Sequence, residues 1–167
     1  MSAITIKKVA TRSDLRHFID FHHDLYEGNP YDVPTLFSDD MNTLSKDKKP
    51  AFDFCEADYF LAYREGRIVG RVAAIINSRA NTRWQRKSVR FGWIDMVDDV
   101  DVARALLDAV AQFGRERGMT EVVGPLGFTD FDPEGMLTDG FDQLGTMATI
   151  YNYPYYPKLM EQLGGWE

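Results

Sequence analysis

The 167-residue sequence contains one cysteine and three histidines, and this scarcity removes several classes of site. The single cysteine, Cys55, excludes an internal disulfide framework, and no activating base stands near it, so we expect a small half-buried side chain. His22 and His23 are adjacent and point in different directions on a helix, so they cannot share a metal ion. With the third histidine at position 17, no Ser-His-Asp arrangement suggests itself. We therefore expect no metal site. Of the two adjacent histidines, we expect one at the edge of the core and one exposed.

Long apolar runs and an excess of basic residues are also missing. The longest apolar run, Val72 to Ile76, is far too short to span a bilayer, and the first residues lack the basic-then-apolar order of a secretory signal. We therefore expect a cytoplasmic protein without a membrane partner. A net charge of -7 argues against nucleic acid, because such binding depends on Lys and Arg releasing counterions. The basic cluster is more simply a solvated loop, and it comprises Arg79, Arg83, Arg86, Lys87 and Arg90.

What the sequence does contain is a 44% apolar composition, with a strand, a helix and a second strand in close succession. A β-branched and aromatic run starts at Val89, apolar residues recur at helical spacing from Val100 to Phe113, and extended structure resumes at Val122. This βαβ unit predicts a parallel strand pair that is covered on both faces. Ligands bind at the carboxyl ends of such strands, and the loop there, residues 97–102, is acidic.

The amino-terminal third predicts a strand, a helix and a long excursion. Ile4 to Val9 alternates like a strand, and Thr11 or Ser13 can cap the helix that follows. Residues 27–57 are irregular apart from a short helix near 36–44. Connections of that length inside a compact domain are usually functional or mobile.

The middle of the chain predicts an antiparallel meander that leads into the βαβ unit. Residues 59–63 and 67–77 flank Glu65-Gly66 as a hairpin, and 81–87 is interpreted as a polar connection. Residues 156–163 repeat at helical spacing and close the chain. We therefore expect an α+β fold of three-layer α/β/α type, in which a mixed sheet holds a meander, one parallel strand pair and flanking helices.

This order of elements resembles the GCN5-related N-acetyltransferase (GNAT) superfamily over essentially the whole chain. The hairpin Asp58 to Gly70, the helix end Gly114 to Met119 and the closing stretch Tyr156 to Gly164 carry the resemblance. Two further stretches, Gly124 to Gly127 and Tyr151 to Tyr156, are similar to a bacterial branch whose members are longer than this chain. The resemblance implies one acyltransferase-like domain without its C-terminal strands.

Without those strands, the domain over 1–167 would leave the strand at Val122 with an exposed edge. We expect that edge to pair with another copy of the chain or with a missing C-terminal region. No other macromolecular partner is expected.

The family resemblance implies transfer of an acyl group from a coenzyme A thioester to a small amine. Acetyl-CoA or another acyl-CoA would be the co-substrate, and no cofactor would be bound tightly. The family binds the coenzyme A pyrophosphate through the loop before the helix, where a Gly-rich backbone and the helix dipole face the phosphates. The corresponding backbone positions in this chain are Met96, Val97, Asp98, Val102 and Ala103.

This loop departs from the family pattern because it has no glycine and contains Asp98, Asp99 and Asp101. Carboxylates near the pyrophosphate repel it, whereas they are favourable as caps in the first turn of a helix. We therefore expect coenzyme A to bind weakly or not at all. The alternative function is a non-catalytic ligand-binding or assembly module that keeps the scaffold without a working phosphate loop.

Two catalytic candidates follow from the resemblance. Relatives keep an acidic residue on the central strand as a direct or water-mediated base, and Asp95 holds this position beside Trp93, where burial would raise its pKa. A structural acceptor is the equal alternative for Asp95. Met160 falls where the family has a tyrosine that protonates the departing thiolate, and a thioether cannot donate a proton. Tyr156, one turn earlier, is the substitute if the helix is shifted.

The aromatic stretch 151–157 combines apolar area with polar tips, which suits the wall of a small-molecule crevice. A protein interface or a packed core lid would use the same residues. Asp130 to Gly135 copies the first half of a calcium loop, but Phe141 stands where a bidentate acid is required, so we expect no calcium site. The residues expected to contact substrate are Phe128, Asn152, Tyr153 and Tyr155.

Overall fold

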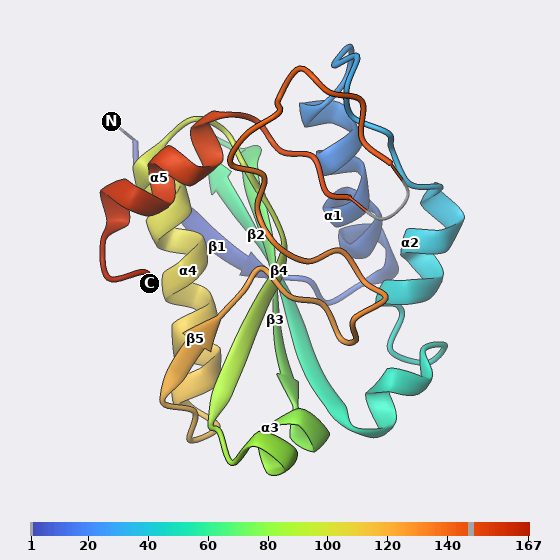
Figure 1. The fold of residues 1–167 in the computed structure, drawn as a ribbon, viewed down its shortest axis with the longest axis vertical. Helices are drawn as coiled ribbons and strands as arrows, with labels where there is room; N and C mark the ends of the chain where they lie inside the picture. Colours follow the sequence, from blue (N-terminus) through green and yellow to red (C-terminus); the bar gives the residue numbers. More distant parts are fainter. Residues whose placement is uncertain (1, 147–148) are drawn as a thin grey trace.

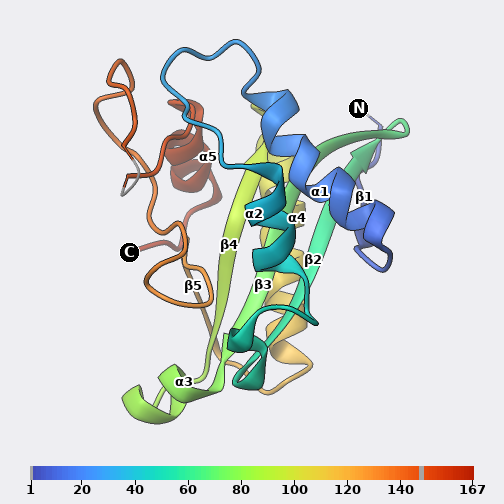
Figure 2. The same ribbon diagram turned by 90° about the vertical axis from the view of Figure 1, so that its right-hand side faces the viewer.

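The computed structural model describes residues 2–146 and 149–167, which form a five-stranded sheet with helices on both faces (Figure 1, Figure 2). The strand order is β1-β2-β3-β4-β5, with antiparallel neighbours from β1 to β4 and a parallel β4–β5 pair. The predicted α+β class with one parallel strand pair is therefore confirmed. β5 lies at the sheet edge, and the pairing of that edge with another chain stays a prediction.

The elements are β1 (Thr5–Lys8), α1 (Arg12–Leu25), α2 (Phe37–Leu44), the 3-10 helix η1 (Pro50–Asp53), β2 (Cys55–Arg64), β3 (Arg67–Asn77), α3 (Ser78–Trp84), β4 (Ser88–Met96), α4 (Val100–Arg115), β5 (Glu121–Val123) and α5 (Tyr155–Leu163). The polar connection predicted at 81–87 was missing a helix, because α3 occupies its first four residues. This short helix buries none of its residues and so shows no apolar period; its signal is Asn77, whose side chain accepts from the Ala80 N–H.

Local sequence signals set the predicted turns. Thr11 caps α1 in a capping box with Asp14, which satisfies two backbone donors at the helix start. Glu65 and Gly66 both have positive φ, the conformation that a two-residue hairpin loop of type I′ requires between β2 and β3.

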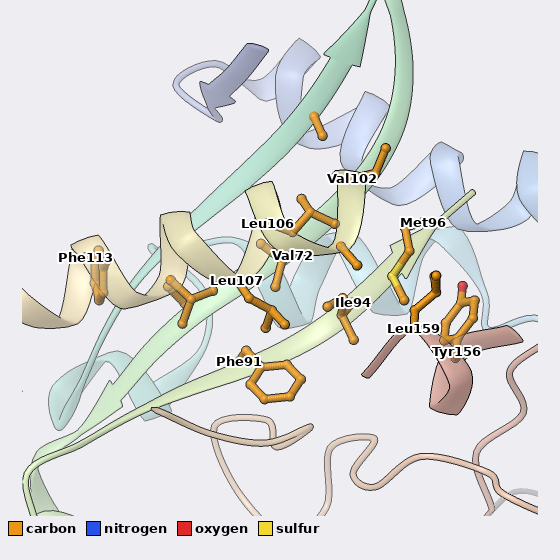
Figure 3. Packing of buried hydrophobic residues seen from close by; sticks show 14 of the residues in the cluster. Val72, Phe91, Ile94, Met96, Val102, Leu106, Leu107, Phe113, Tyr156 and Leu159 are labelled. Carbon is orange, nitrogen blue, oxygen red and sulfur yellow. The ribbon is translucent and has the colours of Figure 1, made fainter. Parts of the chain in front are cut away.

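Two apolar layers cover the two faces of the sheet. On one face α4 and α5 pack on the sheet, and Figure 3 shows Leu106 of α4 above Val72 of β3, and Tyr156 of α5 beside Met96 at the end of β4. On the other face, α1 and α2 cover a separate cluster that includes Phe18 and Met41 (Figure 2). Among the described residues, no helix is long and apolar enough to cross a membrane.

A bulge in β4 interrupts the ladder near the carboxyl end of that strand. Arg71 pairs with Asp95 and Ala73 pairs with Gly92, so β4 carries one residue more than β3 between these two pairs. Trp93, inside the bulge, has φ of 46°, a left-handed conformation that is rare for a bulky residue and is usually enforced by a functional site. The segment after β5 crosses here so closely that a Cβ on Gly92 would lie 2.3 Å from the Leu126 carbonyl oxygen.

Candidate functional site

A cavity of about 440 Å³ opens beside the β4 bulge, between α1, the connection 26–36 and residues 133–146 and 149–152. That volume suits a small-molecule ligand. Most of the wall is apolar and includes Val33, Leu36, Trp93, Ile94, Met136 and Ile150. The polar side chains of the lining come from separate elements, and they are His22, Asp32, Thr35, Asp40, Arg71, Asp95, Thr146, Thr149, Asn152 and Tyr156.

Asp95 is the centre of the polar end. Its Oδ2 accepts from His22 Nδ1 at 2.9 Å and from Arg71 Nε at 2.8 Å, and its Oδ1 accepts from the Tyr156 hydroxyl at 2.7 Å. The Arg71 side chain also donates to the Phe18 carbonyl oxygen, so both partners of this ion pair are buried and hydrogen-bonded. One carboxylate thus joins α1, β3, β4 and α5.

The charges of this cluster determine its protonation. Burial alone raises the pKa of Asp95, but the His22 and Arg71 charges outweigh burial and hold that pKa well below its usual value of 3.8. The expectation that burial beside Trp93 would raise the pKa of Asp95 was therefore wrong in sign. Burial acts in the opposite direction on His22 and lowers its pKa. The Asp95 charge and the hydrogen bonds to Asp32 and Asp95 outweigh burial and raise this pKa to about 9.

The second ring nitrogen of His22, Nε2, points toward Asp32, which lines the cavity. Nε2 lies 3.5 Å from Asp32 Oδ2, and the ring stacks on Tyr26 with 4.5 Å between ring centroids. Tyr26 also stacks on Tyr153, so a row of stacked rings holds the imidazole plane in place. An imidazole held by a carboxylate at Nδ1, with Nε2 toward a cavity, is arranged to accept or donate a proton.

The pair predicts a pH dependence of stability. The folded pKa of His22, about 9, exceeds the ordinary 6.5, so its stabilisation is full below pH 6.5 and is lost as pH rises through about 9. The Asp95 pKa is lowered, so its contribution is full above 3.8 and is lost at lower pH. We expect unfolding free energy to fall by on the order of 3 kcal/mol between pH 6.5 and 9.5, measured by urea titration at each pH. His22→Asn should flatten this limb; an equal decline in that variant would contradict the assignment.

Two curated proteins are similar to this chain in sequence. Protein YghO of Escherichia coli (strain K12) is 31% identical over 159 residues, covering 95% of this chain and 40% of that protein. Bacterial ceramide synthase of Caulobacter vibrioides (strain NA1000 / CB15N) is 32% identical over 162 residues, covering 95% of this chain and 42% of that protein. The chain thus spans about two fifths of the length of these relatives. No protein-family model matches the chain.

Solved structures decide the fold. A tandem GNAT protein from the clavulanic acid biosynthesis pathway superposes with a TM-score of 0.55 at 16% identity, covering 72% of this chain and 35% of that chain. The chain has the GNAT fold. The predicted resemblance is confirmed at the level of the fold.

In a GNAT fold the loop from β4 to α4 is the expected pyrophosphate site, and here its groups are engaged. The Met96 carbonyl accepts from the Tyr155 hydroxyl, the Val97 N–H donates to Val69, and the Ala103 N–H donates to Asp99. The Asp99 carboxylate accepts from the Asp101 N–H as the helix cap and pairs with Arg64. Val102 and Ala103 are fully buried, and Asp98 lies just before the cap. The Asp99 carboxylate thus occupies a backbone donor at this helix start.

Of the four residues predicted to contact substrate, the cavity lining includes one. Asn152 lines the cavity, with its amide bonded to both backbone groups of Leu137. Tyr153 and Tyr155 lie behind the cavity wall, where their hydroxyls bond the Leu25 and Met96 carbonyl oxygens. The structure places Phe128 in the apolar cluster under α1 and α2, away from the cavity lining.

Sequence reasoning missed His22, Arg71 and Asp32 as members of the cavity lining. His22 had been assigned to the edge of the core, and its signal is a polar residue within the apolar stripe of α1. Arg71 stands opposite Asp95 only because the bulge shifts the register, and a sequence does not show that shift. Asp32 lies in the connection 27–57, whose path depends on packing.

Proposed function

We propose that the chain transfers an acyl group from a coenzyme A thioester to an amine. The Asp95–His22 pair, with Nε2 toward an apolar cavity in a GNAT fold, is the observation that carries this proposal. The relative named bacterial ceramide synthase supports an amine acceptor, because a ceramide is the amide of a long-chain amino alcohol.

His22 is proposed as the base, and Asp95 as the residue that positions it. Asp95 has a lowered pKa and three donors, so it is a poor acceptor for a further proton. The amine nitrogen attacks the thioester carbon, the C–N bond forms and the C–S bond breaks. An ammonium substrate loses two protons: one enters solvent before attack, and His22 Nε2 takes the second from nitrogen and returns it to sulfur. Tyr156 donates to Asp95, so we assign it to holding this carboxylate rather than to protonating the thiolate.

In this proposal, a backbone N–H of the bulge stabilises the oxyanion that develops on the thioester carbonyl. Trp93 and Ile94 both lie opposite Val72, so the β3 ladder cannot pair the backbone of both. Trp93 and Ile94 also line the cavity. A fixed backbone N–H directed at the carbonyl oxygen stabilises charge that appears in the transition state.

The test is an acyl-transfer assay with acetyl-CoA and palmitoyl-CoA against a panel of primary amines. Thiol release and amide formation are measured together by a thiol reagent and mass spectrometry. We expect amide formation to depend on amine, with a rate that rises toward pH 9 as His22 loses its proton. Binding of both ligands without amide formation at any pH would overturn the proposal.

One observation favours the alternative, a binding module without transfer activity: the start of α4 is closed by its own Asp99 carboxylate. This cap occupies donors that a phosphate would use, and its charge opposes a phosphate. The cap therefore predicts weak coenzyme A binding under either function, and the two functions differ in whether amide forms at high acyl-CoA concentration.

At sub-millimolar concentration, coenzyme A should not measurably change the melting temperature of the wild-type chain. Asp99→Gly keeps an acceptable cap residue, frees the donors and releases Arg64 for phosphate. In that variant, coenzyme A at a hundred times its dissociation constant should raise the melting temperature by roughly 5–10 °C. Asp108→Ala, which removes an exposed acid farther along α4, is the matched control. Equal, saturable shifts in wild type and Asp99→Gly would contradict the role of the cap.

A further inference from the structure

The cavity joins an acidic inner end to an apolar wall that continues to the surface. Asp32 lies at the inner end with a side chain 9% exposed. At the mouth, Val33 and Leu36 are 56% and 68% exposed although both are large apolar residues. Exposed apolar side chains that line a cavity indicate a surface that an apolar ligand covers.

The Asp32 carboxylate has unused acceptor capacity. Within residues 2–146 and 149–167, its one recorded partner is His22 Nε2 at 3.5 Å, beyond the range of a good hydrogen bond. A carboxylate accepts up to about four hydrogen bonds. Asp95, by contrast, is fully engaged by His22, Arg71 and Tyr156. The third carboxylate of the lining, Asp40, accepts a hydrogen bond from the Thr35 hydroxyl, so Asp32 is the carboxylate beside His22 that can receive a cationic group from a ligand.

We propose that Asp32 anchors the ammonium group of an amine whose long hydrocarbon chain lies along the apolar wall and leaves past Val33 and Leu36. This rests on the proposed function, since it names the class of acyl acceptor for that site. The nitrogen then lies beside His22 Nε2, the position from which the imidazole can take its second proton during attack, after the first has entered solvent. Asp32 is thus the specificity-determining residue for a cationic amphiphile over a neutral or short amine.

Proton release accompanies this binding. Within the described residues, the charged groups that face His22 are Asp95 of β4, Arg71 of β3 and Asp32 of the connection, and Tyr26 stacks on the ring. An ammonium at Asp32 competes for one of the two carboxylates that hold the imidazolium. Binding at pH 8 should therefore release a proton, seen as a calorimetric heat that changes with the ionisation enthalpy of the buffer.

The test is calorimetric titration of the chain with butyl-, hexyl-, octyl- and decylamine, without any acyl donor. Affinity should rise roughly fourfold per added methylene, the fold-change that corresponds to about 0.8 kcal/mol for each buried CH₂. 1-Octanol should bind at least about tenfold more weakly than octylamine, because it lacks the charge-assisted bond to Asp32.

Variants separate the two ends of the ligand. Asp32→Asn should abolish the preference for octylamine over octanol and keep the dependence on chain length, whereas Leu36→Asn should reduce that dependence for octyl and decyl chains. Asp39→Asn, which removes an exposed charge from α2, should change neither. Affinity independent of chain length, or an unchanged preference in Asp32→Asn, would overturn the inference. Alkylamine binding as expected without acyl transfer would overturn the proposed function alone.

Discussion

Replacing Asp95 by asparagine should lower the free energy of unfolding by about 3–5 kcal/mol, the usual cost of removing one partner of a buried ion pair. The Arg71 side chain is 6% exposed and has Asp95 as its charged partner, so the variant leaves a buried guanidinium without a counterion. The amide also places a donor near Arg71 or the Tyr156 hydroxyl. Urea titration at pH 6 measures the loss, because both contributions of the pair are full at that pH.

Asp101→Asn is the control for this measurement. Asp101 and Arg104 form an ion pair with both side chains 51% exposed, and such surface pairs contribute at most about 1 kcal/mol. If Asp95→Asn cost no more than Asp101→Asn, the pair beside the bulge would not be the electrostatic centre that its contacts indicate.

His22→Asn should reduce the turnover rate of acyl transfer by about 10²–10⁴-fold, the usual contribution of a general base. The asparagine amide can still donate to Asp95, so the buried carboxylate keeps a partner while the proton acceptor toward the cavity is removed. The rise of the turnover rate toward pH 9 should disappear in this variant. Turnover is measured under saturating ligands, with circular dichroism to confirm that the variant is folded.

His23→Asn is the matched control, because His23 neighbours His22 on α1 and makes an edge contact with its ring. This variant should retain turnover within a few-fold of wild type. A loss shared equally by both variants would indicate general damage to α1, and the base would have to be sought elsewhere in the cavity.

The sequence predicted the elements that depend on local signals. Thr11 with Asp14, the Glu65-Gly66 turn and the apolar period of α4 each act within a few residues, so the pattern alone is sufficient. The acidic loop was likewise interpreted correctly as a helix cap, since Asp99 bonds a backbone N–H two residues away. The antiparallel meander and the parallel strand pair were predicted from the succession of these elements along the chain.

The site was less predictable because its bonds join distant residues. Asp95 and Tyr156 were both named, yet their mutual bond spans 61 residues and no local pattern shows it. The sign of the Asp95 pKa shift depends on His22 and Arg71, which approach only through α1 packing and the bulge. Burial beside Trp93 was visible in the sequence, but the two cations that outweigh it were not.

The contribution of Tyr156 from α5 also sets the order in which the site is completed during synthesis. The ribosome delivers His22, Arg71 and Asp95 well before Tyr156, and domains begin to fold from their amino-terminal part as they emerge. Until α5 docks, Asp95 Oδ1 lacks its Tyr156 donor and the apolar surface around Met96 lacks its cover from Leu159. The chain should therefore acquire affinity for a ligand in this cavity only once α5 has docked.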